Sequence, residues 1–156
     1  YDSDIEISRI YNEIAFVYIN NNNLTKSLEN IETALNYLSK IPEYFNPLKL
    51  NYYKGLTYHN KGIIRKNSGD LEKSKQKFEK GLKDVDNKSI KKLNNEDLEI
   101  YNNCKQKIIL VKNDLDFIRN GCFEDSNKKN CPKRISFSVQ DIDGVWINPK
   151  GLEEES

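Results

Sequence analysis

Few residues in this sequence have the types and spacing that catalysis or metal binding requires. The single histidine, His59, lies in a helical pattern with no carboxylate or cysteine at the spacing of a ligand set, so we expect a surface or groove histidine. Cys122, Cys131 and His59 do not have the spacing of a zinc finger. Glycine-rich phosphate loops of the P-loop or dinucleotide type are also missing. The sequence therefore predicts a protein that is not an enzyme and uses neither a cofactor nor a metal.

The three cysteines are expected to differ in their roles. Three thiols cannot all pair within one chain, so we expect reduced thiols in an intracellular, cytoplasmic protein. The alternative is an exported protein, in which Cys122 and Cys131 could close a small loop. Cys104 lies on the apolar side of a predicted helix and is expected in the core.

Length and composition predict one domain without a membrane span. The chain has 156 residues, of which 37% are hydrophobic and 31% charged, enough for a single modest core. No apolar run approaches the ~18 residues that a membrane span needs. The net charge is +1, but residues 61–92 hold eleven basic and five acidic side chains. Because these lysines alternate with acidic residues, as on a solvated helix surface, we do not expect nucleic-acid binding.

The chain contains an internal repeat with an offset of 47 residues. In chain order, the matched positions are Tyr11, Ala15, Val17, Leu24, Lys26, Ser27, Ile31, Ala34 and Leu35 with Tyr58, Gly62, Ile64, Leu71, Lys73, Ser74, Phe78, Gly81 and Leu82. Ala15 and Ala34 are 19 residues apart, and so are Gly62 and Gly81. Two antiparallel helices that cross closely need a small side chain on each at the contact. Each unit is therefore predicted to be a helix hairpin.

These residues resemble the pattern of the tetratricopeptide repeat family. That pattern sets an aromatic, an aliphatic, a small and an aromatic residue on the first helix, and a small, an aromatic and a small residue on the second. The first unit matches with Tyr11, Ile14, Ala15 and Tyr18, then Ser27, Ile31 and Ala34, and the second with Tyr58, Gly62, Ser74, Phe78 and Gly81. Lys61 and Arg65 stand where apolar residues belong. A second register, with Gly55 and Tyr58 in the small and aromatic positions, also fits if the helix is two turns longer than usual. A period of 47 residues, against about 34 for ordinary repeats, indicates such a long-helix variant.

The resemblance implies a concave surface, lined by the first helix of each hairpin, that binds a partner protein or peptide. Its contact positions fall on Arg9, Asn12, Phe16, Asn20, Tyr52, Leu56, His59 and Lys66. Family members that bind chaperone tails grip a carboxylate with lysine, asparagine and arginine. Here only Asn60 agrees and Glu99 would repel the carboxylate, so we do not expect a chaperone tail as partner. We expect an interaction scaffold or a subunit of a larger assembly. The alternative is a peptide-sensing domain, similar to those of long-helix bacterial regulators.

Helical periodicity predicts an all-α domain of five helices over residues 1–120. The helices cover about residues 4–20, 24–39, 47–67, 70–84 and 96–120, and the last is expected to cap the second hairpin. Ile7, Ile10, Tyr11, Ile14, Ala15 and Tyr18 form the apolar stripe of the first helix. Residues 121–156 are expected to form a partly ordered extension. Within it, Ile135, Phe137, Val139 and Trp146 flank an Asp143-Gly144 turn and predict a short β-hairpin, followed by an acidic tail.

Overall fold

The computed structural model describes residues 1–122, 124–125 and 127–132, which are helical over most of their length. The helices are α1 (Asp2–Asn20), α2 (Leu24–Ser39), α3 (Pro47–Arg65), α4 (Ser68–Lys88) and α5 (Asn95–Arg119), with a 3-10 turn at Ile90–Lys92. The predicted all-α fold of helix hairpins is confirmed for these residues. The predicted β-hairpin and acidic tail lie outside them.

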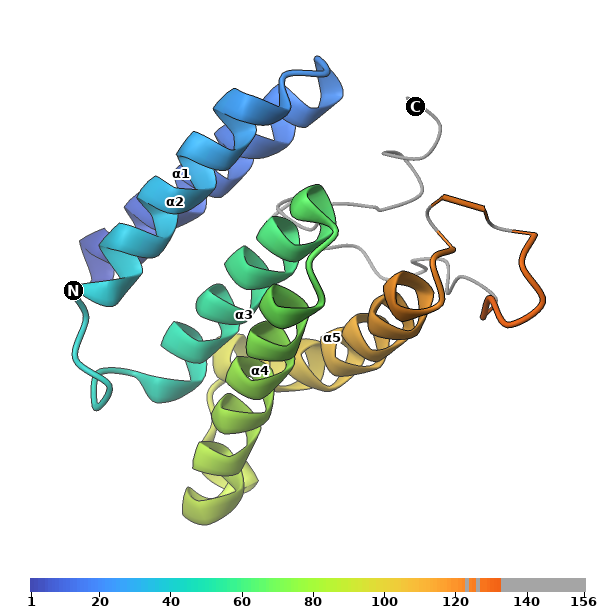
Figure 1. Ribbon diagram of the computed structural model, residues 1–156. Coiled ribbons are helices and arrows are strands. Elements are labelled where there is room, and N and C mark those ends of the chain that lie inside the picture. Colours follow the sequence, from blue (N-terminus) through green and yellow to red (C-terminus); the bar gives the residue numbers. More distant parts are fainter. Residues whose placement is uncertain (123, 126, 133–156) are drawn as a thin grey trace.

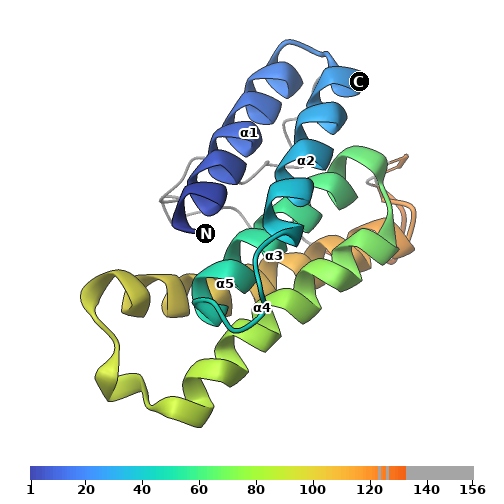
Figure 2. The ribbon, with the colours of Figure 1, turned by 90° about the vertical axis from the view of Figure 1, so that its left-hand side faces the viewer.

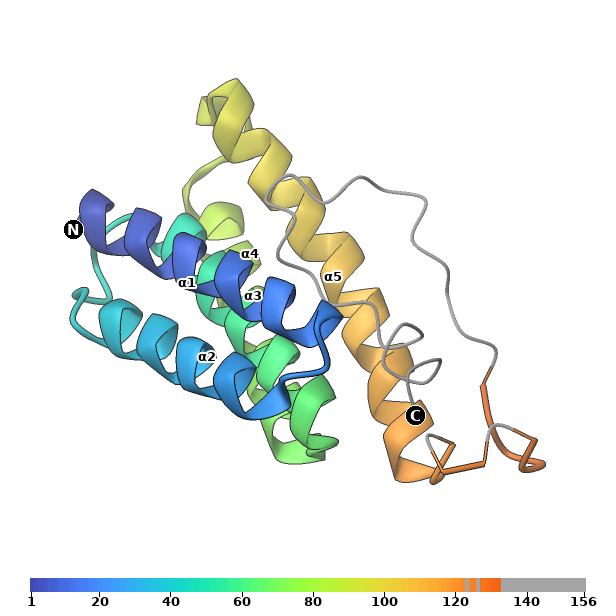
Figure 3. The same cartoon turned by 90° about the horizontal axis from the view of Figure 1, so that it is seen from above.

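The helices form two antiparallel hairpins followed by α5 (Figure 1). α1 packs on α2, and α3 packs on α4 (Figure 2). The first hairpin contacts α3 through both of its helices, while α5 lies against α4 and α3. Seen from above, the two hairpins and α5 follow one another across the molecule (Figure 3). The fold is therefore a short stack in which α3 is the central helix.

Asparagine side chains begin three of the helices. Asn23, Asn67 and Asn94 each accept a hydrogen bond from the backbone N–H three residues ahead. Such a cap satisfies one of the N–H groups that a helix start leaves without a partner. Asn67 therefore starts α4 at Ser68, two residues before the predicted start, and Gly69 lies inside the helix. α3 ends correspondingly early, because Lys66 takes a left-handed conformation with φ of 51°.

Two serine hydroxyls define the register of the two hairpins. Ser27 Oγ donates to the backbone oxygen of Ala15 at 2.9 Å, and Ser74 Oγ donates to that of Gly55 at 2.6 Å. Gly55, and not Gly62, is therefore the structural counterpart of Ala15. The structure supports the second register proposed from the sequence. Relative to the first hairpin, the second has extra helical residues on both sides of its turn.

The small residues admit bulky side chains and do not face each other. A Cβ atom on Gly55 would lie 2.6 Å from the Phe78 ring, and one on Gly62 would lie 2.8 Å from Leu71. At Gly81 the nearest atoms, in Asn51 and Leu48, would be an ordinary 3.5 Å away. The prediction of a hairpin was right, but its reason is corrected. Gly55 and Gly62 each lie against a large side chain of α4, whereas Gly81 has room for a Cβ atom.

The end of the described chain turns back on itself after α5. Cys122 and Cys131 form a disulfide, which corrects the expectation of reduced thiols at these two positions. Cys104 is a buried free thiol, as predicted, and burial raises its pKa to about 12. Arg119 Nη2 bonds Glu72 Oε1 at 2.6 Å and ties the end of α5 to the start of α4. No described helix is long and apolar enough to cross a membrane.

Candidate functional site

The predicted partner contacts divide into buried and accessible side chains. Asn12, Tyr52, Leu56 and His59 are fully buried, whereas Arg9 and Phe16 are half-buried and Asn20 and Lys66 are exposed. All eight lie on or at the ends of α1 and α3, as the resemblance implies. Their contact with a partner stays a prediction, and a partner could reach the four buried ones only if the surrounding chain moved.

A polar contact joins α1 to α3 at the centre of the predicted concave side. Asn12 Nδ2 donates to Thr57 Oγ1 at 2.9 Å, and Asn60 Nδ2 donates to Asn12 Oδ1 at 3.4 Å. All three residues are fully buried. Buried amides are costly unless they are hydrogen-bonded, so these contacts fix how the first hairpin sits on α3.

His59 joins α3 to α5 in the same way. Its Nε2 lies 2.7 Å from Asp114 Oδ2, and the side chains are 0% and 6% exposed. The sequence-based expectation of a surface or groove histidine without a carboxylate partner is wrong. The partner is 55 residues away and only the packing of α5 brings it close, so local spacing could not have revealed it.

Tyr52 and Leu56 belong to the hydrophobic core. The Tyr52 ring packs edge-on against Tyr53 and tilted against Phe78, with centroids 5.3 and 6.0 Å apart. Leu56 is among the largest fully buried side chains. Both residues therefore stabilise the stack, in addition to any predicted role in binding.

Several aliphatic side chains are exposed along one side of α1. Ile10, Ile14 and Val17 are 46%, 36% and 55% exposed, and Ile7 beside them is half-buried. Their spacing of three and four residues places them in one line along the helix. Contiguous exposed apolar side chains can mark an interaction site. We call these four residues the α1 stripe. The sequence analysis placed Ile7, Ile10 and Ile14, but not Val17, in the apolar stripe of the first helix, and it did not show that Ile10 and Ile14 are exposed.

The corresponding side of α3 packs against the preceding hairpin. Lys61 Nζ on that side pairs with Glu32 of α2 at 2.7 Å, and Thr57 meets Asn12 of α1. The two possible registers of the repeat differ by seven residues. Seven residues are almost two full turns of a helix, so a shift between the registers hardly changes which side of α3 a residue of α1 corresponds to. In both registers the α1 stripe therefore corresponds to this side of α3. On α3, this is the side that stacks on the preceding hairpin.

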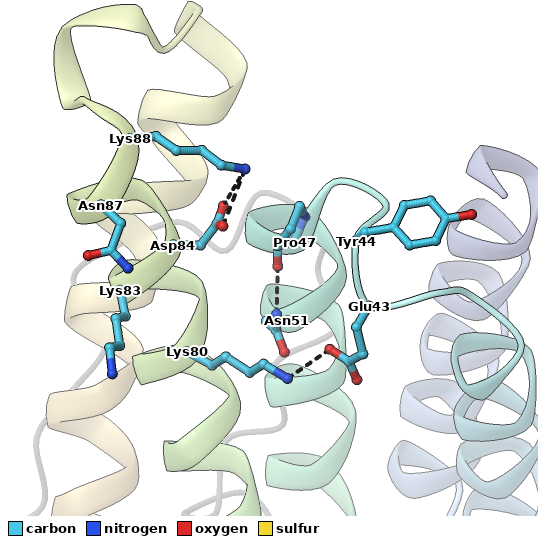
Figure 4. Close-up of a pocket in the computed structure, with 9 residues that line it drawn as sticks. All are labelled: Glu43, Tyr44, Pro47, Asn51, Lys80, Lys83, Asp84, Asn87 and Lys88. Carbon is cyan, nitrogen blue, oxygen red and sulfur yellow. Dashed lines mark hydrogen bonds and ion pairs between the residues drawn. The ribbon is translucent and has the colours of Figure 1, made fainter.

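A polar pocket lies between the 40–46 loop, α3 and α4 (Figure 4). It has a volume of about 500 Å³ and is lined by Glu43, Tyr44, Pro47, Asn51, Lys80, Lys83, Asp84, Asn87 and Lys88. Its carboxylates are already paired, Glu43 with Lys80 at 2.8 Å and Asp84 with Lys88 at 3.3 Å. The hydrogen bond from Lys80, together with Lys54, lowers the pKa of Glu43 to about 2. Ion pairs therefore line this pocket on both sides.

The described residues contain no group of three or more His, Cys, Asp or Glu side chains that could hold a metal ion. Comparison of the chain with protein-family models, with curated proteins and with solved structures finds no match. The site must therefore be interpreted from its own geometry.

Proposed function

We propose that this chain is a protein-interaction module, a scaffold or subunit of a larger assembly, which stacks a helical partner on the α1 stripe. The observation that carries the proposal is the correspondence between α1 and α3. The side of α3 that packs on the first hairpin has its counterpart on α1 in a line of exposed aliphatic side chains.

The chemistry of the stripe indicates what the partner presents. On α3 the stacking side includes Lys54 and Lys61, which pair with Glu43 and Glu32. On α1 that side has isoleucine and valine instead, so its partner needs an apolar face and no matching carboxylates. A helix hairpin with such a face fits best, because stacking of hairpins continues an interface that the protein already contains.

Burial of the stripe would contribute to binding. Full burial of an isoleucine or valine side chain contributes about 1.5–3 kcal/mol, and these residues are already partly buried, so each has roughly half of that left to gain. Arg9 and Phe16, on the adjacent side of α1, would extend the contact towards the predicted concave surface. With Arg9 and Phe16 in contact, the partner would also touch the predicted concave surface, and the buried residues of α3 would not have to become exposed.

The test compares partner binding by matched charged variants. Ile10→Glu with Val17→Glu places two carboxylates in the stripe, and Asn36→Glu with Gln76→Glu places two on exposed positions of α2 and α4. Partners captured by the wild-type chain are purified, and their dissociation constants are measured by calorimetry. We expect the stripe variant to bind at least tenfold more weakly and the control to bind within twofold of wild type. Equal binding by all three proteins would exclude the stripe as the docking surface.

A further inference from the structure

Four lysines gather where α3 and α4 meet the end of α2. They are Lys54 of α3 and Lys73, Lys77 and Lys80 of α4. Glu43 bonds Lys54 at 3.1 Å and Lys80 at 2.8 Å, and Lys73 lies over the Tyr58 ring at 5.6 Å. Within the described residues, neither Lys73 nor Lys77 has a carboxylate within ion-pair distance. One carboxylate thus faces four ammonium groups.

A small cavity opens at the centre of this cluster. Its volume is about 90 Å³, and it is lined by Leu35, Leu38, Ser39, Lys54, Tyr58 and Lys77. A single water needs only ~10–15 Å³ on this scale, so the cavity holds a group of several non-hydrogen atoms. Lys54, Lys77 and Tyr58 bring two ammonium groups and a phenol to the lining, beside the apolar Leu35 and Leu38. Ammonium groups and a phenol can donate hydrogen bonds, which suits an oxyanion. The Ser39 hydroxyl already donates to the backbone oxygen of Asn36 at 2.7 Å.

The surroundings of Lys77 agree with a missing counter-charge. Burial lowers the pKa of its ammonium group most, and the positive charge of Lys54 lowers it further. Glu43 raises this pKa by less than Lys54 lowers it, and Lys80 and Lys73 add smaller lowering effects. Other lysines on this surface are neutralised by carboxylates, as Lys61 is by Glu32 and Lys75 by Glu72. Lys77 is half-buried and has no such neutralisation.

We propose that the cavity between α2, α3 and α4 binds a phosphate group through Lys54 and Lys77, with Tyr58 as a hydroxyl donor. A phosphate fits better than a carboxylate because two further positive charges match a dianion, and Glu43 already supplies a carboxylate. The site is remote from the α1 stripe and does not depend on the function proposed above. A free phosphate and a phosphorylated side chain of a partner share this chemistry.

The test follows the lysine side-chain NMR signals of the folded chain during titration with inorganic phosphate, against sodium chloride of equal ionic strength. We expect saturable shifts at Lys54 and Lys77 with phosphate only, and an upward shift of the Lys77 pKa. Lys77→Gln should weaken phosphate binding at least tenfold. Lys75→Gln, on the same helix but paired with Glu72, should leave it within twofold of wild type.

Two further measurements distinguish a free phosphate from a phosphorylated protein, and a specific pocket from a diffuse basic surface. If a phosphoserine peptide binds more tightly than inorganic phosphate and still depends on Lys77, a modified protein is the ligand. Equal affinities would indicate a free phosphate. Shifts that chloride reproduces, or equal losses in Lys77→Gln and Lys75→Gln, would overturn the proposal. So would binding of a single-stranded RNA that both variants weaken alike, because it would show a diffuse basic surface and no pocket.

Discussion

Ser74 donates a hydrogen bond to the backbone oxygen of Gly55, and this contact aligns the second hairpin with the first, where Ser27 donates to Ala15. At the aligned position the Phe78 ring of α4 fills the space beside Gly55 of α3. The stack therefore depends on a glycine whose helix propensity is poor but whose missing side chain is needed.

Gly55→Ala should destabilise the protein although alanine is the better helix former. The new Cβ would lie 2.6 Å from the Phe78 ring, and overpacking of this kind costs about 1–3 kcal/mol, against a propensity gain of about 1 kcal/mol. Urea unfolding monitored by circular dichroism measures the difference. Gly81→Ala is the matched control, since its Cβ meets only ordinary 3.5 Å contacts and should leave stability unchanged or raised. If Gly55→Ala is as stable as Gly81→Ala, the close approach is not required.

Glu43→Gln should reduce stability at neutral pH and change its acid dependence. The folded-state pKa of Glu43 is lowered to about 2 from its usual value of 4.5, so its contribution is present above pH ~4.5 and is lost as the pH falls through about 2. Because the side chain is 54% exposed, solvent screens the interaction and we expect less than about 1 kcal/mol.

Urea midpoints at pH 7 and pH 2.5 test this contribution. The difference between wild type and Glu43→Gln should be clear at pH 7 and smaller at pH 2.5. Glu79→Gln, an exposed change on α4, is the control and should leave both midpoints unchanged. If the difference in urea midpoint between wild type and Glu43→Gln is the same at both pH values, the lowered pKa of Glu43 is not its cause.

Cys104 should be unreactive in the folded protein. The thiolate is the reactive form, and burial raises the pKa of this thiol to about 12, so almost none is present at pH 8. Iodoacetamide should modify Cys104 at the rate of global unfolding, and quickly in 6 M urea. Mass spectrometry of the modified peptide measures both rates. Fast modification under native conditions would show that the helix is not packed as described.

The sequence predicted the hairpins well because their signals are local. Helical periodicity, Pro47 at the first turn of α3 and the Asn20 to Asn23 run identify the elements from neighbouring residues alone, and α2 has the predicted bounds. The shorter α3 and longer α4 were missed because Asn67 could cap a helix at Ser68 or belong to a turn. Only the contact of Ser74 with the backbone oxygen of Gly55, matched by Ser27 with Ala15, decides between the two registers.

The candidate surfaces were less predictable because they depend on contacts between distant elements. His59 was misjudged since Asp114 comes from α5, and Tyr52 is buried because α3 is surrounded by helices. In the α1 stripe, the helical pattern around Ile14 is the same whether a neighbouring helix covers this side chain or leaves it exposed. The position of α1 at the edge of the stack leaves it exposed.

The central claim, that the α1 stripe accepts another helix hairpin, is tested most directly by building one. A second copy of residues 2–46 inserted before Tyr1 would bring the Leu35 and Leu38 side of its α2 against the stripe, as the original copy does against α3. We expect one cooperative thermal transition, with a melting temperature about 5 °C or more above that of the 156-residue chain, from roughly 2 kcal/mol of added burial. Ile10→Glu with Val17→Glu in the original copy should abolish that gain. An inserted hairpin that melts separately and leaves the melting temperature unchanged would contradict the account.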